Sequence, residues 1–102
     1  MAHRTPADEQ AARELYLYAD NTSELYNQKR SIIDNLRRKA NKGIYDHSKA
    51  IKLWKYWMEA AARSYCKEFG CHISVFSPAT RELAASMVES DEWAEYECNG
   101  WA

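Results

Sequence analysis

Side chains that recur at helical spacing through the first 42 residues constrain the fold more than any other feature of the sequence. They follow one another at alternating steps of three and four residues: Leu15, Tyr18, Thr22, Leu25, Lys29, Ile32 and Leu36. Such steps place side chains on one face of an α-helix. Thr5 and Pro6 suit the N-cap and the first position of a helix. The pattern therefore predicts helical structure that begins near Pro6.

The polar stretch "DNTSE", residues 20–24, interrupts this pattern locally and leaves two interpretations open. One is a single helix from about Pro6 to Lys42. The other is a break near Asp20–Ser23, followed by a second helix that Asn21 caps, with Glu24 in its third position. Short polar side chains compete with helical hydrogen bonds for the backbone groups beside them. We therefore favour the break.

Signals that end one helix and start another meet in "NKGIYD", residues 41–46. Gly43 can take the left-handed conformation that closes a helix, and Asp46 is a good N-cap. The next helix should run to Gly70, with Trp54 and Trp57 on a wide apolar face that packs against more than one neighbour. A short loop between two amphipathic helices predicts an antiparallel helical hairpin.

The remaining chain should add one helix. Ile73, Val75 and Phe76 could form an extended segment, which would lack a partner strand, and Ser77 and Pro78 then suit the start of a fourth helix. Only three glycines and two prolines occur in 102 residues, which argues against an all-β fold. We predict an all-α fold, a small bundle of three to four helices built round the hairpin. It should form a single domain, 1–102, in which residues 89–102 are an acidic aromatic tail that adds a last turn or frays.

Basic residues gather around the predicted hairpin. Nine basic and two acidic residues lie between Asn27 and Tyr56, which gives a local charge of +7 in a chain of net charge -1. The predicted partner-binding surface contains six of them: Arg37, Arg38, Lys39, Lys42, Lys49 and Lys52. Tyr45, Tyr56 or a tryptophan could stack on a base beside it. A solvated helical corner, whose cations complement the helix dipole, explains the same pattern without any partner.

Acidic and aromatic residues alternate near the end of the chain, where no basic residue follows Arg81. A second predicted partner-binding segment contains Asp91, Glu92, Trp93 and Tyr96. Because exposed tryptophans are costly, we expect this segment to dock, on the basic hairpin of its own chain or on that of a second copy.

No pattern of catalytic or cofactor-binding residues stands out, so we predict that the protein is not an enzyme and binds no cofactor. His47 lies between Asp46 and Ser48, and helix capping explains that trio. Cys66, Cys71 and His72, with Cys98, have spacing that structural zinc rarely uses, so no metal site is predicted. Because Cys66 lies on the predicted helix, it should also face away from Cys71 in the loop, unless the helix ends early.

Targeting signals are missing from the sequence. The start, "MAHRTPADEQ", has no apolar core of a signal peptide, and no apolar run is long enough to span a membrane. Three cysteines, an odd number, fit a disulfide framework poorly. These features predict a cytoplasmic protein without a membrane partner.

Three blocks of the sequence resemble small uncharacterised helical proteins encoded by tailed bacteriophages: "ELYLYADNTSELYNQKRSIIDNLRRK", "KGIYDHSKAIKLWKYWMEAAARSYCKEFG" and "FSPATRELAA". The "KGIYD" turn, the helix entry that follows it and the "KEFG" end are the most specific parts. The resemblance implies a phage origin and expression in the bacterial cytoplasm, and it brings no catalytic residues.

Together these features predict a non-enzymatic interaction protein that binds a host or phage protein and modulates host machinery or defence. The alternative is a nucleic-acid-binding accessory protein that uses the basic hairpin. The sequence leaves a homo-oligomer open.

Overall fold

The computed structural model describes residues 6–99, apart from the side chains of residues 6, 93 and 95–99. This part of the chain forms four α-helices and one turn of 3-10 helix: α1 (Pro6–Asn21), α2 (Ser23–Asn41), α3 (His47–Phe69), η1 (Ile73–Val75) and α4 (Pro78–Asn99). The described residues contain no β-strand. The predicted all-α bundle is therefore confirmed.

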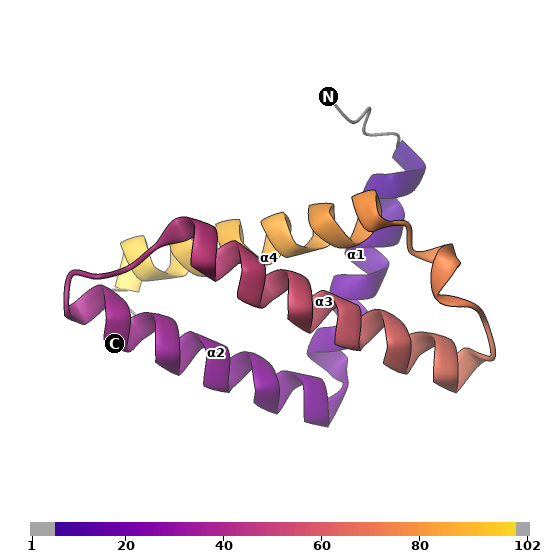
Figure 1. Ribbon diagram of the computed structural model, residues 1–102, viewed down its shortest axis with the longest axis horizontal. Helices are drawn as coiled ribbons and strands as arrows, with labels where there is room; N and C mark the ends of the chain where they lie inside the picture. Colours follow the sequence, from indigo (N-terminus) through magenta and orange to yellow (C-terminus); the bar gives the residue numbers. More distant parts are fainter. Residues whose placement is uncertain (1–5, 100–102) are drawn as a thin grey trace.

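Helix α3 lies at the centre of the arrangement, with α2 on one side of it and α4 on the other (Figure 1). The α2–α3 hairpin is antiparallel, as predicted, and α4 also runs antiparallel to α3. Helix α1 crosses this set at a steep angle and packs against both α3 and α4. The C-terminal half of α4 consequently reaches the same end of the molecule as the α2–α3 turn (Figure 1).

The predicted break between the first two helices occurs at Thr22, whose backbone is extended, with φ of -99° and ψ of 115°. Asn21 is still the last residue of α1, so our assignment of Asn21 as the N-cap was wrong by one position. Thr22 makes no side-chain capping bond to α2; its hydroxyl instead donates to the Tyr18 carbonyl at 2.8 Å. The backbone conformation, and not a capping side chain, therefore sets this boundary.

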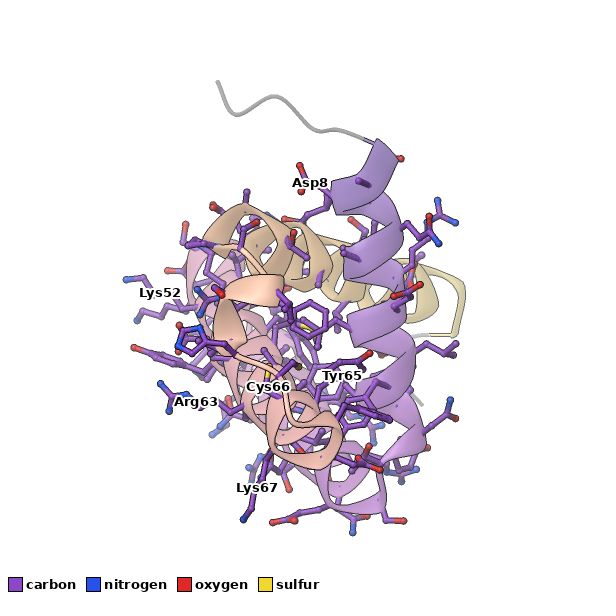
Figure 2. The ribbon with its side chains drawn as sticks, turned by 90° about the vertical axis from the view of Figure 1, so that its right-hand side faces the viewer. Asp8, Lys52, Arg63, Tyr65, Cys66 and Lys67 are labelled. Atoms are coloured by element: carbon purple, nitrogen blue, oxygen red, sulfur yellow. The ribbon has the colours of Figure 1, made fainter. Side chains whose placement is uncertain are left out.

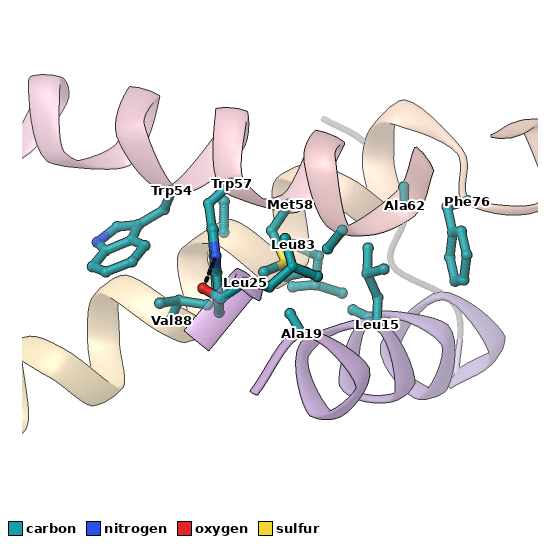
Figure 3. Packing of buried hydrophobic residues seen from close by; sticks show 14 of the residues in the cluster. Leu15, Ala19, Leu25, Trp54, Trp57, Met58, Ala62, Phe76, Leu83 and Val88 are labelled. Carbon is teal, nitrogen blue, oxygen red and sulfur yellow. Dashed lines mark hydrogen bonds between the residues drawn. The ribbon is translucent and has the colours of Figure 1, made fainter. Parts of the chain in front are cut away.

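The core forms where α3 faces α1 and α4 (Figure 3). Trp54 is fully buried and Trp57 is 2% exposed, as the apolar face of the sequence predicts. The Trp57 indole donates a 2.8 Å hydrogen bond to the Leu25 carbonyl and so ties α3 to α2. The buried hydrophobic residues include Ala12, Leu15, Ala19, Leu36, Ala50, Met58, Ala61, Ala62, Phe76, Leu83, Ala84, Ala85 and Val88.

The α3–α4 connection differs from the extended segment considered above. Val75 donates its amide to the His72 carbonyl at 3.1 Å, and Phe76 donates to Ile73 at 3.0 Å, which makes a 3-10 turn. A lone strand would leave these backbone groups without partners, whereas the turn satisfies them locally. Ser77 then caps α4 as predicted, since its hydroxyl accepts the Thr80 amide at 3.1 Å.

Helix α4 continues without interruption to Asn99. Residues 89–99, interpreted from the sequence as the start of a tail, are therefore the second half of this helix. None of the helices in the described part is long and apolar enough to cross a membrane.

Candidate functional site

The turn between α2 and α3 is built by two residues that the sequence identifies. Gly43 has a φ of 73°, in the left-handed region where glycine is favoured. The Asp46 carboxylate accepts hydrogen bonds from the amides of Ser48, at 2.9 Å, and Lys49, at 3.3 Å. Both helix ends are thereby fixed close together, so the basic residues that precede Gly43 and follow Asp46 lie on one corner of the molecule.

The six predicted basic residues, which we call the hairpin surface, are Arg37, Arg38, Lys39, Lys42, Lys49 and Lys52. Four of them are exposed, and Arg37 and Lys39 are half-buried. Within residues 6–99, none of the six forms an ion pair with a described carboxylate. The positive charge of the hairpin surface is therefore not neutralised by the described acidic side chains.

An exposed isoleucine lies at the tip of the hairpin, between these cations. Ile44 is 61% exposed, whereas its neighbour Tyr45 is half-buried and donates its hydroxyl to Glu89 at 3.1 Å. The sequence suggests Tyr45 as the packing residue of this turn, and the structure agrees. Ile44 is instead exposed, and it presents apolar area between Lys42 and Lys49 in the sequence.

A second basic feature runs along the outer side of α3. Exposed residues recur there at steps of three, four, seven and four, and we call them the α3 row: Lys49, Lys52, Tyr56, Arg63 and Lys67. At 1.5 Å per residue the row extends about 27 Å. Figure 2 shows Lys52, Arg63 and Lys67 along one side of the molecule, while Tyr56 is 70% exposed.

Both acidic residues of α3 make contacts with other helices. Glu59 forms an ion pair with Arg81 of α4 at 3.2 Å. Glu68 accepts a hydrogen bond from the Tyr18 hydroxyl of α1 at 2.8 Å. The α3 row therefore consists of four cations and one tyrosine, with Glu59, whose side chain is 42% exposed and paired with Arg81, in the interval between Tyr56 and Arg63.

One cation of the basic stretch is not available to a partner. Lys29 is 8% exposed, and its ammonium lies 3.0 Å from Asp20 of α1 and 3.1 Å from Glu92 of α4. The same nitrogen lies 5.2 Å from the centre of the Tyr16 ring and 5.8 Å from that of Trp57, within the range of cation–π contacts. Lys29 therefore joins all four helices from inside the bundle.

The environment of Lys29 favours its charged form. Burial alone would lower its pKa, but the hydrogen bond to Asp20 and the charge of Glu92 outweigh burial and raise the pKa above the ordinary lysine value. Burial raises the pKa of Tyr16, with the nearby carboxylates adding to it. At neutral pH the cluster therefore holds a charged lysine and a neutral phenol.

The second half of α4 docks on the hairpin of its own chain, but at residues other than the hairpin surface. Glu89 is 6% exposed; one of its oxygens lies 2.8 Å from His47 Nδ1 and accepts the Tyr45 hydroxyl. Burial and the charge of Glu89 both raise the pKa of Tyr45. Among the predicted tail residues, Asp91 is exposed and Glu92 binds Lys29. The side chains of Trp93 and Tyr96 lie outside the described residues.

Sequence reasoning missed these inward-facing contacts, although one signal pointed to them. Lys29 occupies a position in the apolar stripe, where a charged residue needs a buried counter-charge. The identity of the counter-charges, Asp20 and Glu92, depends on how α1 and α4 pack and could not be read from the sequence.

The cysteines also differ from expectation. Cys66 and Cys71 are free, and their thiols contact each other, so the prediction that Cys66 faces away from Cys71 was wrong. The reason is that α3 ends at Phe69 and the chain reverses at Gly70, whose φ is 67°. Within the described residues, no group of three His, Cys, Asp or Glu side chains could hold a metal ion.

Comparison of the chain with known protein families, curated proteins and solved structures found no match. The resemblance to phage proteins therefore stays a prediction, and function has to be argued from the surface itself.

Proposed function

We propose that the protein is a non-enzymatic, phage-type interaction protein that binds an acidic surface of a host or phage protein in the bacterial cytoplasm. The hairpin surface makes the contact, and binding modulates the host machinery or defence to which the partner belongs. The observation that carries the proposal is the exposed Ile44, 61% accessible, at the tip of a corner whose cations form no ion pair with a carboxylate of the described residues.

An apolar anchor within a ring of charges is typical of protein interfaces. The binding energy of such interfaces concentrates in a few residues that become fully desolvated, and the charged rim sets orientation and association rate. Ile44 supplies an anchor, and Arg38, Lys42 and Lys49 supply the rim. An isoleucine side chain makes no favourable contact with a phosphate group, so its exposure at this corner favours a protein partner.

The α3 row supports a second candidate function, the binding of single-stranded nucleic acid. Cations that follow one line can track a phosphate backbone, and an exposed aromatic ring between them can stack on a base. Tyr56 has this position, between Lys52 and Arg63. The α3 row shares Lys49 and Lys52 with the hairpin surface, but Arg63 and Lys67 lie outside that surface, so the two functions can be separated by substitution.

Two variants with equal charge change provide the test. The hairpin variant carries Arg38→Glu and Lys42→Glu, and the α3 variant carries Arg63→Glu and Lys67→Glu; all four residues are exposed, and each belongs to one surface only. Each variant reverses two charges, so a difference between them reports position and not net charge. Circular dichroism would first establish that both variants keep the helical fold.

The proteins would then be used for affinity capture from a nuclease-treated bacterial lysate, together with Ile44→Ser in the wild-type background. We expect the wild type and the α3 variant to retain a common partner that the hairpin variant and Ile44→Ser lose. Equal retention by all four proteins would contradict the proposed site.

Binding of a labelled single-stranded oligonucleotide tests the second candidate. If the α3 row binds phosphates, affinity falls steeply between about 50 mM and about 200 mM salt and disappears in the α3 variant. No binding at low salt would rule out this function.

A further inference from the structure

Two cysteines come together where α3 ends, in a part of the molecule that the proposed function does not use. Gly70 takes the left-handed conformation, with φ of 67° and ψ of 31°, and turns the chain back over the end of the helix. The Cys71 amide then donates a 3.0 Å hydrogen bond to the Cys66 carbonyl. In this type of helix end, the side chains of the two bonded residues meet.

The two thiols differ in how far solvent reaches them. Cys66 is 7% exposed and packs in the core, whereas Cys71 is half-buried at the start of the loop. Burial raises the pKa of the Cys66 thiol, and its hydrogen bond with the Cys71 thiol raises it further. Cys71 is therefore the thiol that a reagent meets first, with Cys66 held behind it.

We propose that Cys66 and Cys71 are a modification site, a thiol pair that a peroxide oxidises to an intrachain disulfide. The bond would fasten the last turn of α3 to the loop that leads into α4.

The reaction proceeds in two steps. The Cys71 thiolate attacks one peroxide oxygen; an S–O bond forms, the O–O bond breaks, and the leaving hydroxide takes up a proton as water. Cys66 then loses its proton and attacks the Cys71 sulfur, an S–S bond forms, and the S–O bond breaks with release of a second water. The two thiols lose two electrons, and hydrogen peroxide is reduced to two waters.

The position of Lys67 makes the product easy to identify. Trypsin cleaves after Arg63, Lys67 and Arg81, so it separates Cys66 on residues 64–67 from Cys71 on residues 68–81. The full chain, carrying Cys98→Ser to remove the third thiol, would be reduced, freed of reductant and treated with hydrogen peroxide. We expect a monomer lighter by two hydrogen atoms, whose tryptic digest contains these two peptides joined.

The other glycine that closes a helix provides a matched control. Gly70 and Gly43 both have positive φ, and at neither would a Cβ meet another atom within 4 Å. Alanine at either position therefore has only a backbone cost. We expect Gly70→Ala to slow disulfide formation several-fold and Gly43→Ala to leave its rate unchanged.

Two results would overturn the proposal. One is oxidation of Cys71 to sulfinic acid while Cys66 remains open to alkylation. The other is an equal rate in the two glycine variants, which would mean that the end of α3 does not bring the thiols together. If Gly70→Ala fails to fold, the thermal midpoint decides: the oxidised chain should melt several degrees higher than the reduced chain, and a lower midpoint would refute a disulfide that fits the fold.

Discussion

Lys29 is the residue whose environment departs most from what its type suggests. Lysine is rarely buried without a partner, yet this one is 8% exposed and lies between Asp20 and Glu92. Removing one member of a buried ion pair costs more than the pair itself contributes, because the remaining charge keeps its desolvation penalty. The two carboxylates make Lys29 a residue that the fold depends on.

We expect Lys29→Met, which preserves length and removes the charge, to lower the free energy of unfolding by about 3 kcal/mol. Urea denaturation, monitored by tryptophan fluorescence, would measure this change in the free energy of unfolding. Arg30→Met is the matched control, since Arg30 is the exposed neighbour on the same helix, and its effect should stay within about 0.5 kcal/mol. Adding Asp20→Asn and Glu92→Gln to Lys29→Met should recover part of the loss; no recovery would mean that the ion pairs are not its cause.

The raised pKa of Tyr16 gives the protein a predictable response to alkali. Above pH of about 10 a tyrosine in the unfolded chain ionises, while Tyr16 in the folded chain keeps its proton. The folded state then binds more protons than the unfolded state, so stability decreases as pH rises through this range. Tyr45 and Lys29, whose pKa values are also raised, act in the same direction.

Tyr16→Phe should therefore lose less stability than the wild type between about pH 9 and about pH 11. Urea midpoints at the two pH values would test this. Tyr56→Phe removes a hydroxyl from a ring that is 70% exposed and serves as the control. The same alkaline loss in Tyr16→Phe and the wild type would contradict the assignment.

At the scale of elements, the boundaries that could be predicted are those set by local chemistry. Four residues each determine the backbone conformation within a few positions: Gly43, Asp46, Gly70 and Ser77. The helix boundaries beside them could therefore be predicted from the sequence. The boundary at Thr22 was placed one residue early because no capping bond fixes it. The ion pair of Lys29 with Asp20 joins α2 to the last turn of α1. No pattern among neighbouring residues in the sequence predicts it.

This difference predicts unequal costs for the two boundary residues. Asp46→Ala removes a carboxylate that accepts two amides and should destabilise the protein by about 1 kcal/mol. Thr22→Ala removes no capping bond and should cost less than about 0.5 kcal/mol. Thermal or urea unfolding of the two variants would compare them, and equal costs would mean that the hydrogen bond of the Thr22 hydroxyl to the Tyr18 carbonyl stabilises the boundary as much as the Asp46 cap does.

At the scale of the molecule, charge is divided between an exposed basic corner and carboxylates that turn inward. The sequence predicted the basic cluster, because the count of cations requires no knowledge of packing. It could not predict which cations remain free: Lys29 is buried and Lys55 pairs with Glu82 at 3.3 Å, whereas Arg38, Lys42 and Lys49 are unpaired within the described residues. That distinction depends on where α4 lies, which is a tertiary property.

The placement of α4 also changes what removal of residues 89–102 should do. A tail that only covers the hairpin surface could be deleted to expose a binding site. However, Glu89 is buried against Tyr45 and His47, and Glu92 neutralises Lys29, so these residues belong to the bundle. Deletion after Val88 would leave Lys29 with one carboxylate and shorten the helix that closes the hairpin end.

We therefore expect the chain that ends at Val88 to melt at least several degrees below the full chain, with a less cooperative transition. Glu89→Gln combined with Glu92→Gln in the full chain should reproduce part of this decrease, because it removes the two charges and keeps the helix. Asp91→Asn, at an exposed position between them, is the control and should change the midpoint little. Differential scanning calorimetry would give all four midpoints. A truncated chain as stable as the full one would show that the second half of α4 is dispensable for folding, and would return it to the role of a covering tail.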